Sequence, residues 1–565
     1  MTELVRDICQ WAIGERCLPL AADLAPGTTA QERRSLAALG GLVRSVAGGV
    51  STDWPEAVQH WARDAPSPPA ALVSAVRRHA RLGDLGIDVF ADAYEGLIAG
   101  PNRRKLGTFF TPPSVVDLML ERAASVLPSP RHIVDPGAGV GAFSIAARRR
   151  WPRAIVTAVD VNVVTLGLLA ARAHMERASE RLVLAHGDYL QWIRDGDCRR
   201  PGPTLLLGNP PYTRHQELDQ KLKSVARDAA GDLVDSGLAG LAAYFLGASL
   251  RSLGDDDALC FVLPGSWTES RYGRPLRNWV WEQSNRHVEL LPFPTSTEVF
   301  PGTRVTAMVL VVGPTTSAAR PLHIERITAK AAARGQQVRT HDREGAASPR
   351  SFGPLLWRRR PGRSSSILLS EIARVRRGVA TGANHFFFLG DEDIEGLPSD
   401  VVLPAVRRLR HVVGNELDRD EHDRIGREGL PRWLLSLRGR DDARHPAVRK
   451  RLADGIAANY DDRYLARVRD PWYVIERIDP PHLLVAFMTK DRFRGVNNTV
   501  QAIPSNSIYG IYLNDPAQAS PLRDWINSDE GQDALRVQAR HYSNGLFKLE
   551  PRDYMQVRVP NELST

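Results

Sequence analysis

The chain of 565 residues is longer than one hydrophobic core usually supports, so we expect two or three domains. Its composition, 43% hydrophobic and 25% charged, is that of a globular protein. No apolar run reaches membrane-spanning length and no signal peptide opens the chain, so we expect a cytoplasmic protein without a membrane partner. The four cysteines have no metal-ligand spacing, so the sequence predicts neither a metal site nor a disulfide framework.

The net charge of +9 is concentrated in one segment. Residues 316–366 hold eleven Lys and Arg against three Asp and Glu, whereas residues 367–565 hold equal numbers of the two kinds. We therefore expect an anionic partner to be attracted most strongly by residues 316–366. The same segment has little helical or strand periodicity and is predicted to be a connector.

The first 100 residues are rich in Ala and Leu at helical spacing, which predicts a small helical domain. A basic stretch then leads into a Thr-Pro-Pro sequence. Thr111 before Pro112 has the form of a helix N-cap followed by proline at the first helical position, and a helix is expected over residues 115–126.

A glycine-rich turn follows a predicted strand that ends at Asp135. Gly137, Gly139 and Gly141 let the backbone bend tightly around a ligand, and a helix is predicted to begin near Phe143. The spacing differs from the dinucleotide-binding fingerprint, and a carboxylate before the turn faces a cationic group better than a phosphate.

Two further predicted strands also lead to acidic residues. The apolar run 154–159 ends in Asp160, the place where a second strand offers a carboxylate to ribose hydroxyls, and the run 182–187 leads to Asp188. Strands of this kind, alternating with helices, predict an α/β fold with a doubly wound, mostly parallel sheet. Its ligand is expected along the carboxyl edge of the sheet.

The fourth predicted strand, residues 205–208, ends in Asn209-Pro210-Pro211-Tyr212. Consecutive prolines cannot continue a sheet, so the strand stops with Asn209 at its edge. The side-chain oxygen of Asn209 and the carbonyl of Pro210 would form a stiff pair of acceptors suited to an NH2 group. Tyr212 can lie flat over the planar ring that carries this amine.

These motifs occur in the order seen in the TaqI-like, gamma-type N6-adenine DNA methyltransferases, and the chain resembles this family over residues 100–315 and more loosely over 367–560. The resemblance implies a class I methyltransferase fold, S-adenosyl-L-methionine as cofactor and double-stranded DNA as partner. It also implies that Phe300 stacks on a target adenine turned out of the duplex, opposite Tyr212. The cofactor-binding residues that it implies are Thr111, Asp135, Gly137, Gly139, Gly141, Asp160, Asp188 and Phe245.

Three of these residues have specific implied roles. The resemblance places Asp135 near the methionine ammonium of the cofactor, Asp160 at the ribose hydroxyls and Asp188 at the adenine amino group. Many relatives have Glu where this chain has Asp135 and Asp160, and the shorter acid could shift a contact to water.

Residues 367–565 resemble the C-terminal target-recognition domain of the family, for which an α+β fold is expected. Basic residues and Gly turns beside short strands can follow a phosphate backbone. The candidate DNA contacts are Arg376, Arg377, Thr381 and Asn544. The predicted organisation is a helical N-terminal domain (1–100), a methyltransferase catalytic domain (101–315), a connector (316–366) and a DNA target-recognition domain (367–565).

The sequence predicts a site-specific DNA adenine-N6 methyltransferase, the modification partner of a separate restriction endonuclease. The alternatives are an N4-cytosine DNA methyltransferase, whose target amine poses the same chemical problem, and an enzyme that acts on RNA or on a protein glutamine. Intact Asp135, Asp160 and Asn209 oppose a DNA-binding module that has lost catalysis. A bifunctional nuclease would need an Asp and Glu-x-Lys cluster, and residues 1–100 hold no convincing one.

Overall fold

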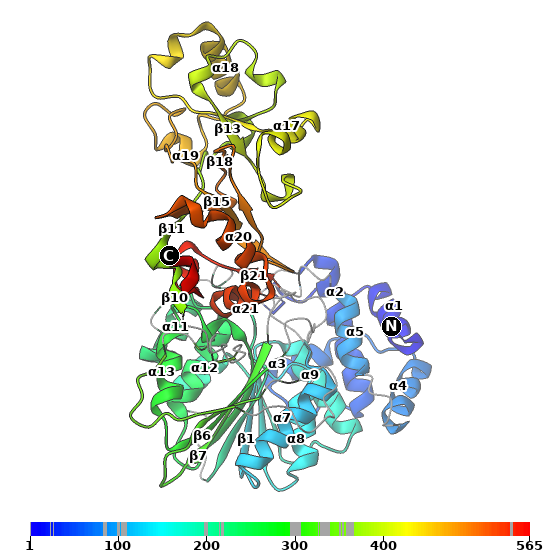
Figure 1. The fold of residues 1–565 in the computed structure, drawn as a ribbon. Helices are drawn as coiled ribbons and strands as arrows, with labels where there is room; N and C mark the ends of the chain where they lie inside the picture. Colours follow the sequence, from blue (N-terminus) through cyan, green and yellow to red (C-terminus); the bar gives the residue numbers. More distant parts are fainter. Residues whose placement is uncertain are drawn as a thin grey trace. The chain divides into compact units, whose positions relative to one another are not determined.

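The computed structural model describes the chain in two compact units, Met1–Phe352 and Gly353–Thr565, which are treated separately below (Figure 1). Residues outside the description are 1, 23, 26–27, 83–87, 99–101, 103–109, 197–201, 214, 216–217, 219, 235, 294–306, 326, 328–338, 350–351, 353–354, 357–365, 543–545 and 565. Among the described residues, no helix combines the length and apolar character needed to cross a membrane.

The first unit is organised around a sheet with the strand order β3-β2-β1-β4-β5-β7-β6-β8-β9. Its parallel part consists of β1 (His132–Pro136), β2 (Ile155–Asp160), β3 (Leu182–His186), β4 (Thr204–Gly208) and β5 (Ala258–Pro264). The strand order reverses between β1 and β4, and such a switch point opens a crevice at the carboxyl ends of the two strands. The predicted doubly wound, mostly parallel sheet is confirmed.

The other half of the sheet is mixed. β7 (Ala307–Thr315) is antiparallel to β5 and to β6 (Arg286–Pro292), between which it lies. β8 (Leu322–Ile324) is parallel to β6, and β9 (Arg339–His341) closes the edge as an antiparallel strand.

The connector prediction for residues 316–366 does not hold for β8 and β9, which are part of this sheet. Leu322 and Ile324 are buried, so this short strand is held by its side chains as well as by its pairing with β6. Arg343, in the same segment, is also buried and donates to the carbonyls of Val280 and Arg286, both at 2.7 Å. Burial lowers the Arg343 pKa to about 10. This positive charge therefore lies in the protein interior and not on the surface of the segment.

Helices cover both faces of the sheet. α8 (Ala142–Arg150) and α9 (Val163–Met175) form the connections from β1 to β2 and from β2 to β3, whose right-handed crossover places them on one face, and α7 (Pro113–Val126) packs against α8. The return from β3 to β4 and β5 places α10 (Tyr189–Arg194) and α12 (Leu241–Ser252) on the other. Two more helices of the first unit are α11 (Gln220–Ala230) and α13 (Arg274–Glu282).

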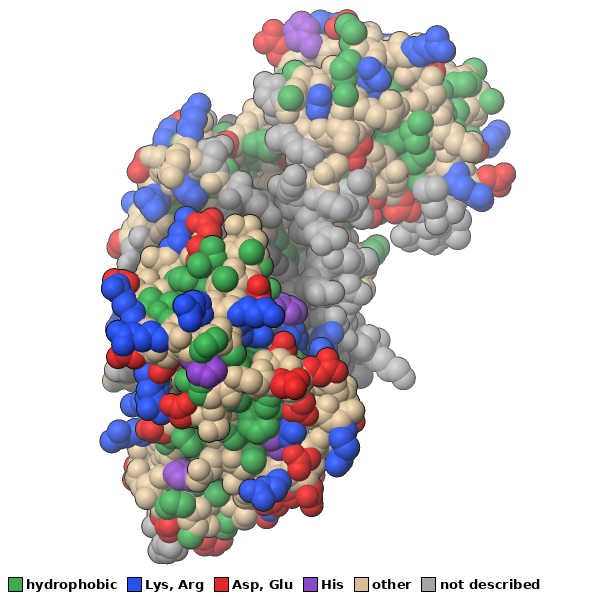
Figure 2. All heavy atoms as spheres, turned by 90° about the horizontal axis from the view of Figure 1, so that it is seen from above, with side chains coloured by type: hydrophobic (Ala, Val, Ile, Leu, Met, Phe, Trp, Pro, Cys, Tyr) green, Lys and Arg blue, Asp and Glu red, His purple; other side chains and the backbone are tan. Residues whose placement is uncertain are grey.

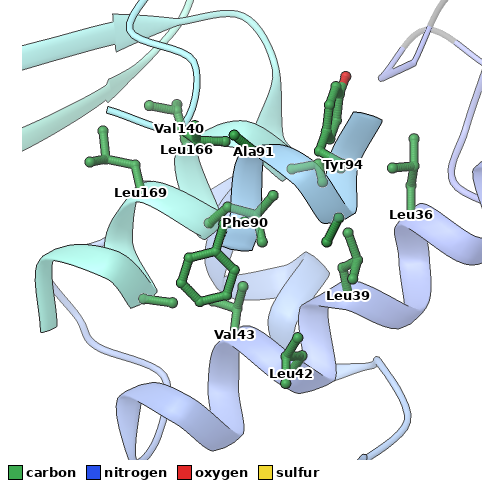
Figure 3. Packing of buried hydrophobic residues seen from close by; sticks show 14 of the residues in the cluster. Leu36, Leu39, Leu42, Val43, Phe90, Ala91, Tyr94, Val140, Leu166 and Leu169 are labelled. Carbon is green, nitrogen blue, oxygen red and sulfur yellow. The ribbon is translucent and has the colours of Figure 1, made fainter. Parts of the chain in front are cut away.

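The predicted N-terminal helices are present as α1 (Glu3–Gly14), α2 (Ala30–Ala47), α3 (Glu56–Arg63), α4 (Ala70–Leu82) and α5 (Val89–Leu97). They are not packed as a separate body, because their apolar faces share one buried cluster with α9. Figure 3 shows this cluster, in which side chains of α2 and α5 meet those of α9 and of the glycine turn. The boundary predicted near residue 100 therefore falls inside one hydrophobic core.

The second unit contains two four-stranded sheets, consistent with the α+β fold expected for the C-terminal part. The first has the order β11 (Ala373–Arg377), β19 (Ile508–Leu513), β15 (Leu483–Ala486) and β17 (Gly495–Asn497). Its core includes side chains of α20 (Ala519–Asn527), α21 (Asp529–Gln538) and α22 (Pro551–Met555).

The second sheet has the order β12 (Phe388–Leu389), β14 (Trp433–Leu435), β13 (Val402–Val406) and β18 (Ile503–Pro504). Its separate core contains Phe386, Phe387 and Phe388. The smaller elements are β10 (Ser366–Leu368) paired with β22 (Arg558–Pro560), β16 (Met488–Thr489) with β21 (Leu546–Lys548) and β20 (Arg540–Tyr542), and helices α15 (Leu369–Ile372), α16 (Asn384–Phe387), α17 (Arg419–Arg427), α18 (Pro446–Ala457) and α19 (Tyr464–Arg467).

Candidate active site

The crevice at the switch point brings together segments that are distant in sequence. Asp135 and Asp160 lie at the carboxyl ends of β1 and β2, and Asn209 follows the last residue of β4, as predicted. A Cβ atom on Gly137 would lie 3.5 Å from Cδ of Pro211 and 4.0 Å from the carbonyl oxygen of Asn209. The glycine turn and the Asn-Pro-Pro-Tyr segment therefore lie next to each other, close enough that a methyl group on Gly137 would touch Pro211.

The glycine turn needs glycine for two physical reasons. Gly137, Gly139 and Gly141 have φ angles of 72°, 54° and 84°, in the left-handed region that side chains disfavour. At Gly141 a Cβ atom would also lie 2.0 Å from Cδ1 of Leu169 on α9. The turn is thus tight and closely packed, and α8 begins directly after it.

Asp135 is a buried carboxyl group, with a side chain that is 1% exposed. One oxygen, Oδ2, accepts hydrogen bonds from the backbone N–H and the hydroxyl of Ser144, at 2.9 and 2.6 Å. The other, Oδ1, has no hydrogen-bond partner within the part of the chain that the structure describes. Burial raises the Asp135 pKa to about 7, against the opposing effect of the Ser144 hydrogen bonds. Such an acceptor is suited to a cationic ligand group.

Asp160 connects the second strand to the glycine turn. Its Oδ2 accepts from the N–H of Gly139 at 2.7 Å, and its Oδ1 accepts from the N–H of Asn162 at 2.8 Å. Burial raises the pKa of Asp160, and these hydrogen bonds oppose the shift. Each carboxylate oxygen has two lone pairs, so both can also accept from ligand hydroxyls.

Asp188 and Phe245 are linked through Tyr189, which follows Asp188 in the chain and packs on Phe245. Asp188 is the N-cap of α10, where its Oδ1 accepts from the N–H of Leu190 at 2.8 Å, and burial raises its pKa. The ring of Tyr189, the next residue, lies 5.0 Å from the ring of Phe245 between centroids, at 31°. Phe245 is buried on α12. The ring of Phe245 therefore packs on the residue that directly follows the capping carboxylate.

Thr111 does not cap α7 as predicted. Pro112 occupies the N-cap position and Pro113 the first helical position, so the helix begins one residue later than a Thr111 cap requires. The hydroxyl of Thr111 instead accepts a hydrogen bond from Nδ2 of Asn209 at 3.1 Å. Thr111 is thus placed against the candidate catalytic segment rather than at a helix end.

The remaining residues of that segment are partly enclosed. Pro210 is buried. Tyr212 is half-buried and packs against the hydrophobic cluster that α7 and α8 form with the sheet. Burial raises the pKa of the Tyr212 hydroxyl well above its ordinary value, so this group is neutral. Phe300, predicted to stack on the target base, lies outside the described residues.

The predicted DNA contacts of the second unit have different surroundings. Arg376 is exposed on β11, whereas Arg377 forms an ion pair with Glu550 at 3.2 Å. Thr381 is fully buried, and its hydroxyl donates to Oδ1 of Asn384 at 2.6 Å, so the structure gives it a turn-stabilising role rather than a DNA contact. Asn544 lies outside the described residues. Over the face seen in Figure 2, Lys and Arg side chains are interspersed with Asp and Glu.

Two residues that hold the carboxylates of the candidate site were not predicted from the sequence. Ser144 holds Asp135, and Asn162 contacts Asp160 while its side-chain oxygen caps α9 by accepting from the N–H of Val164 at 3.0 Å. Asn162 could have been identified, because Asn two residues after a strand end and before an apolar helix has the form of an N-cap. Ser144 carries no such local pattern.

Three family models match separate parts of the chain. A model described as N-6 DNA Methylase matches residues 85–171, and one described as Eco57I restriction-modification methylase matches residues 204–300. The C-terminal domain of Type II methyltransferase M.Eco57I matches residues 360–565. These three matches cover the glycine turn, the Asn-Pro-Pro-Tyr segment and most of the second unit.

Two curated relatives match along most of the chain. Type II methyltransferase M.XamI of Xanthomonas campestris pv. amaranthicola is 27% identical over 82% of this chain and 86% of its own length. Type II methyltransferase M.AccI of Acinetobacter calcoaceticus is 20% identical over 81% of this chain and 86% of its own.

The fold is similar to that of a solved restriction-modification enzyme, the Type IIL enzyme MmeI in complex with DNA. The TM-score is 0.53 at 14% sequence identity, over 93% of this chain and 78% of that one. The doubly wound sheet and these matches identify the chain as a class I methyltransferase that uses S-adenosyl-L-methionine and that is similar, over the matched residues, to the N6-adenine DNA methylases.

Proposed function

We propose that this chain is a site-specific DNA methyltransferase that acts on the N6 amino group of adenine, as the modification enzyme of a restriction-modification system. The observation that carries the proposal is the close approach of Pro211 to Gly137 in the switch-point crevice, where a Cβ atom on Gly137 would lie 3.5 Å from Cδ of Pro211. It supports one shared site for the amine acceptors of the fourth strand and the cofactor turn of the first. The Type II methyltransferase relatives support the restriction-modification context.

The residues around the glycine turn fit the cofactor. The buried carboxyl of Asp135 suits the ammonium of the methionine part, the two oxygens of Asp160 suit the ribose hydroxyls, and Asp188 with Phe245 suits the adenine ring. When bound, the cofactor supplies an electrophilic methyl group. The protein has to hold this methyl group and the target amine in line.

Asn209 and Pro210 would bind the target amine. An adenine amino nitrogen is a weak nucleophile because its lone pair is delocalised into the ring. The hydrogen bond from Nδ2 of Asn209 to Thr111 orients the amide so that Oδ1 is the group directed at the amine. The carbonyl of Pro210, stiffened by Pro211, provides the second acceptor. Together they hold the two amine hydrogens and direct the lone pair toward the methyl group, without a strong base.

The target base has to leave the duplex to reach this crevice. Unstacking costs about a few kcal/mol, which stacking on aromatic side chains offsets. We assign one stacking face to Tyr212 and the other to Phe300. The second unit would bind DNA and read the recognition sequence, with Arg376 and Arg377 as candidate phosphate contacts.

The experiment that tests this function is transfer of tritium from labelled S-adenosyl-L-methionine to duplex DNA, RNA and a release-factor protein, followed by nucleoside analysis. We expect label in N6-methyladenine of duplex DNA. Label in N4-methylcytosine, in RNA or in protein would contradict the proposal. Asn209→Ala serves as the matched control, since it removes one amine acceptor and leaves the proposed cofactor contacts in place.

We further propose a separate endonuclease with the same recognition sequence. An extract of the source cells should cleave unmodified DNA and spare DNA first methylated by the purified chain. Equal cleavage of both DNAs would contradict a shared recognition sequence.

A further inference from the structure

The N-terminal helices reach the candidate cofactor site through Tyr94. This residue lies on α5 and is fully buried. Its hydroxyl oxygen accepts a hydrogen bond from Nδ2 of Asn162 at 2.7 Å. Its ring meets the ring of Phe110 edge to face, with centroids 6.0 Å apart and planes at 73°. One side chain of α5 thus contacts two different segments of the methyltransferase core.

Both partners of Tyr94 touch the cofactor loops. The N–H of Asn162 donates to Asp160, and Asp160 accepts from the N–H of Gly139. The ring of Phe110 lies beside the same turn, because a Cβ atom placed on Gly139 would be 3.5 Å from Cε1 of Phe110. These contacts form a closed circuit of Tyr94, Asn162, Asp160, Gly139 and Phe110, here named the Tyr94 circuit.

The helix that carries Tyr94 is firmly held on the core. Asp88, the N-cap of α5, forms an ion pair with Arg172 of α9 at 2.6 Å. The neighbouring helix α3 is held on α9 as well, because Trp61 packs closely on Gly167. A Cβ atom on Gly167 would lie 2.0 Å from the Trp61 ring. Figure 3 shows Phe90 pointing into the shared apolar cluster while the hydroxyl of Tyr94 points away from the side chains of α2.

Asn162 is fixed at both ends of its amide. Its oxygen accepts from the N–H of Val164 at the start of α9, and its nitrogen donates to Tyr94. The backbone N–H of Asn162 therefore has a defined position from which to hold Oδ1 of Asp160. Such indirect support determines how precisely a binding group is placed before its ligand arrives.

We propose that Tyr94 is a positioning residue for S-adenosyl-L-methionine, and that helices α1 to α5 complete the cofactor site through the Tyr94 circuit. The inference rests on the proposed function, because it takes Asp160 and the glycine turn as the cofactor contacts. Tyr94 itself does not touch the reacting atoms. Its effect is on the affinity for the cofactor and not on the methyl-transfer step.

The test is Tyr94→Phe in the full-length chain, with cofactor binding measured by titration calorimetry in the absence of DNA. This change keeps the ring on Phe110 but leaves the Asn162 amide without its acceptor. We expect the dissociation constant for S-adenosyl-L-methionine to rise about tenfold, the size expected for losing a buried hydrogen bond. At saturating cofactor, kcat and the KM for DNA should stay within about twofold of wild type.

Phe90→Leu is the matched control, because Phe90 lies on the same helix and in the same apolar cluster but outside the Tyr94 circuit. It should lower the Tm while leaving cofactor affinity unchanged. Phe110→Leu enters the circuit from its other side and should weaken cofactor binding about threefold or more.

The outcomes separate the two proposals. A wild-type chain that binds no S-adenosyl-L-methionine overturns the proposed function and this inference together. A wild-type chain that binds it, with Tyr94→Phe binding equally well, overturns the positioning role alone. Weaker binding by Phe90→Leu, to the same extent as by Tyr94→Phe, would show a general loss of stability and also overturn it.

Discussion

Replacing Thr111 with valine tests whether this residue orients Asn209 for methyl transfer. The two side chains are joined by a hydrogen bond of 3.1 Å from Nδ2 of Asn209, and Thr111 is 9% exposed. Valine preserves the shape of threonine but removes the acceptor. The Asn209 amide then loses its preference for directing Oδ1 toward the target amine, because the two amide orientations differ less in energy.

The magnitude follows from the energy of this hydrogen bond. A net value of about 1 kcal/mol corresponds to a loss of about fivefold in the productive orientation. An unsatisfied N–H in a fully buried site costs up to about 3 kcal/mol, or about a hundredfold, and this is the upper limit here because Asn209 is only half-buried. We therefore expect Thr111→Val to lower the single-turnover transfer rate by between about fivefold and a hundredfold at saturating cofactor.

The assay is single-turnover methylation of duplex DNA with enzyme in excess, with cofactor affinity measured separately by calorimetry. Thr111→Ser keeps the hydroxyl and should recover most of the rate. Two results would refute the reasoning. In the first, Thr111→Val transfers at the wild-type rate but binds the cofactor weakly, so the hydroxyl serves the cofactor alone. In the second, Thr111→Ser is as slow as Thr111→Val, so the methyl group is what matters.

Three further outcomes are expected. Asn209→Ala should bind S-adenosyl-L-methionine as wild type while losing at least about a hundredfold in transfer rate, as for other lost transition-state contacts, and loss of cofactor binding would instead give Asn209 a structural role. Because burial raises the Asp135 pKa to about 7, and only the ionised carboxylate attracts the cofactor ammonium, calorimetric affinity should fall as the pH is lowered from about 7.5 to about 5.5. A flat profile would contradict this role. Gly141→Ala should lower the free energy of unfolding by about 2–5 kcal/mol in urea titrations, since it combines a φ of 84° with a clash on Leu169, whereas Gly14→Ala, with no atom within 4 Å, should have little effect.

Four strands of the parallel half could be predicted because each is followed by a strong local signal, an acid or the Asn-Pro-Pro-Tyr segment. The strands before Asp135 and Asp160 are continuous apolar runs that end in an acid, which is typical of strands buried on both faces. The strand before Asn209 stops where proline removes the next donor. β8 and β9 have only three residues each, too few for any periodicity, so the segment that contains them was predicted to be a connector.

The candidate site was predictable only where its residues follow strands directly. The contact of Ser144 with Asp135 crosses nine positions, and that of Tyr94 with Asn162 crosses 68, so neither leaves a local pattern in the sequence. The N-terminal helices were predicted from their amphipathic spacing, but this spacing did not reveal that they pack on α9. Amphipathic spacing shows that a helix buries one face, but does not show what the face is buried against.

Thr111 shows how a tertiary contact decides between local alternatives. In the sequence Thr111-Pro112-Pro113 either proline suits the first helical position, so capping preferences leave the helix start uncertain by one residue. In the structure Pro113 takes that position and Thr111 stays outside the helix, where its hydroxyl accepts from Asn209, 98 positions away. A Thr111 cap would turn this hydroxyl toward the helix N–H groups and away from Asn209. Because Pro113 is the first helical residue, Thr111 stays outside the helix. Its hydroxyl therefore remains available to Asn209 at the end of β4.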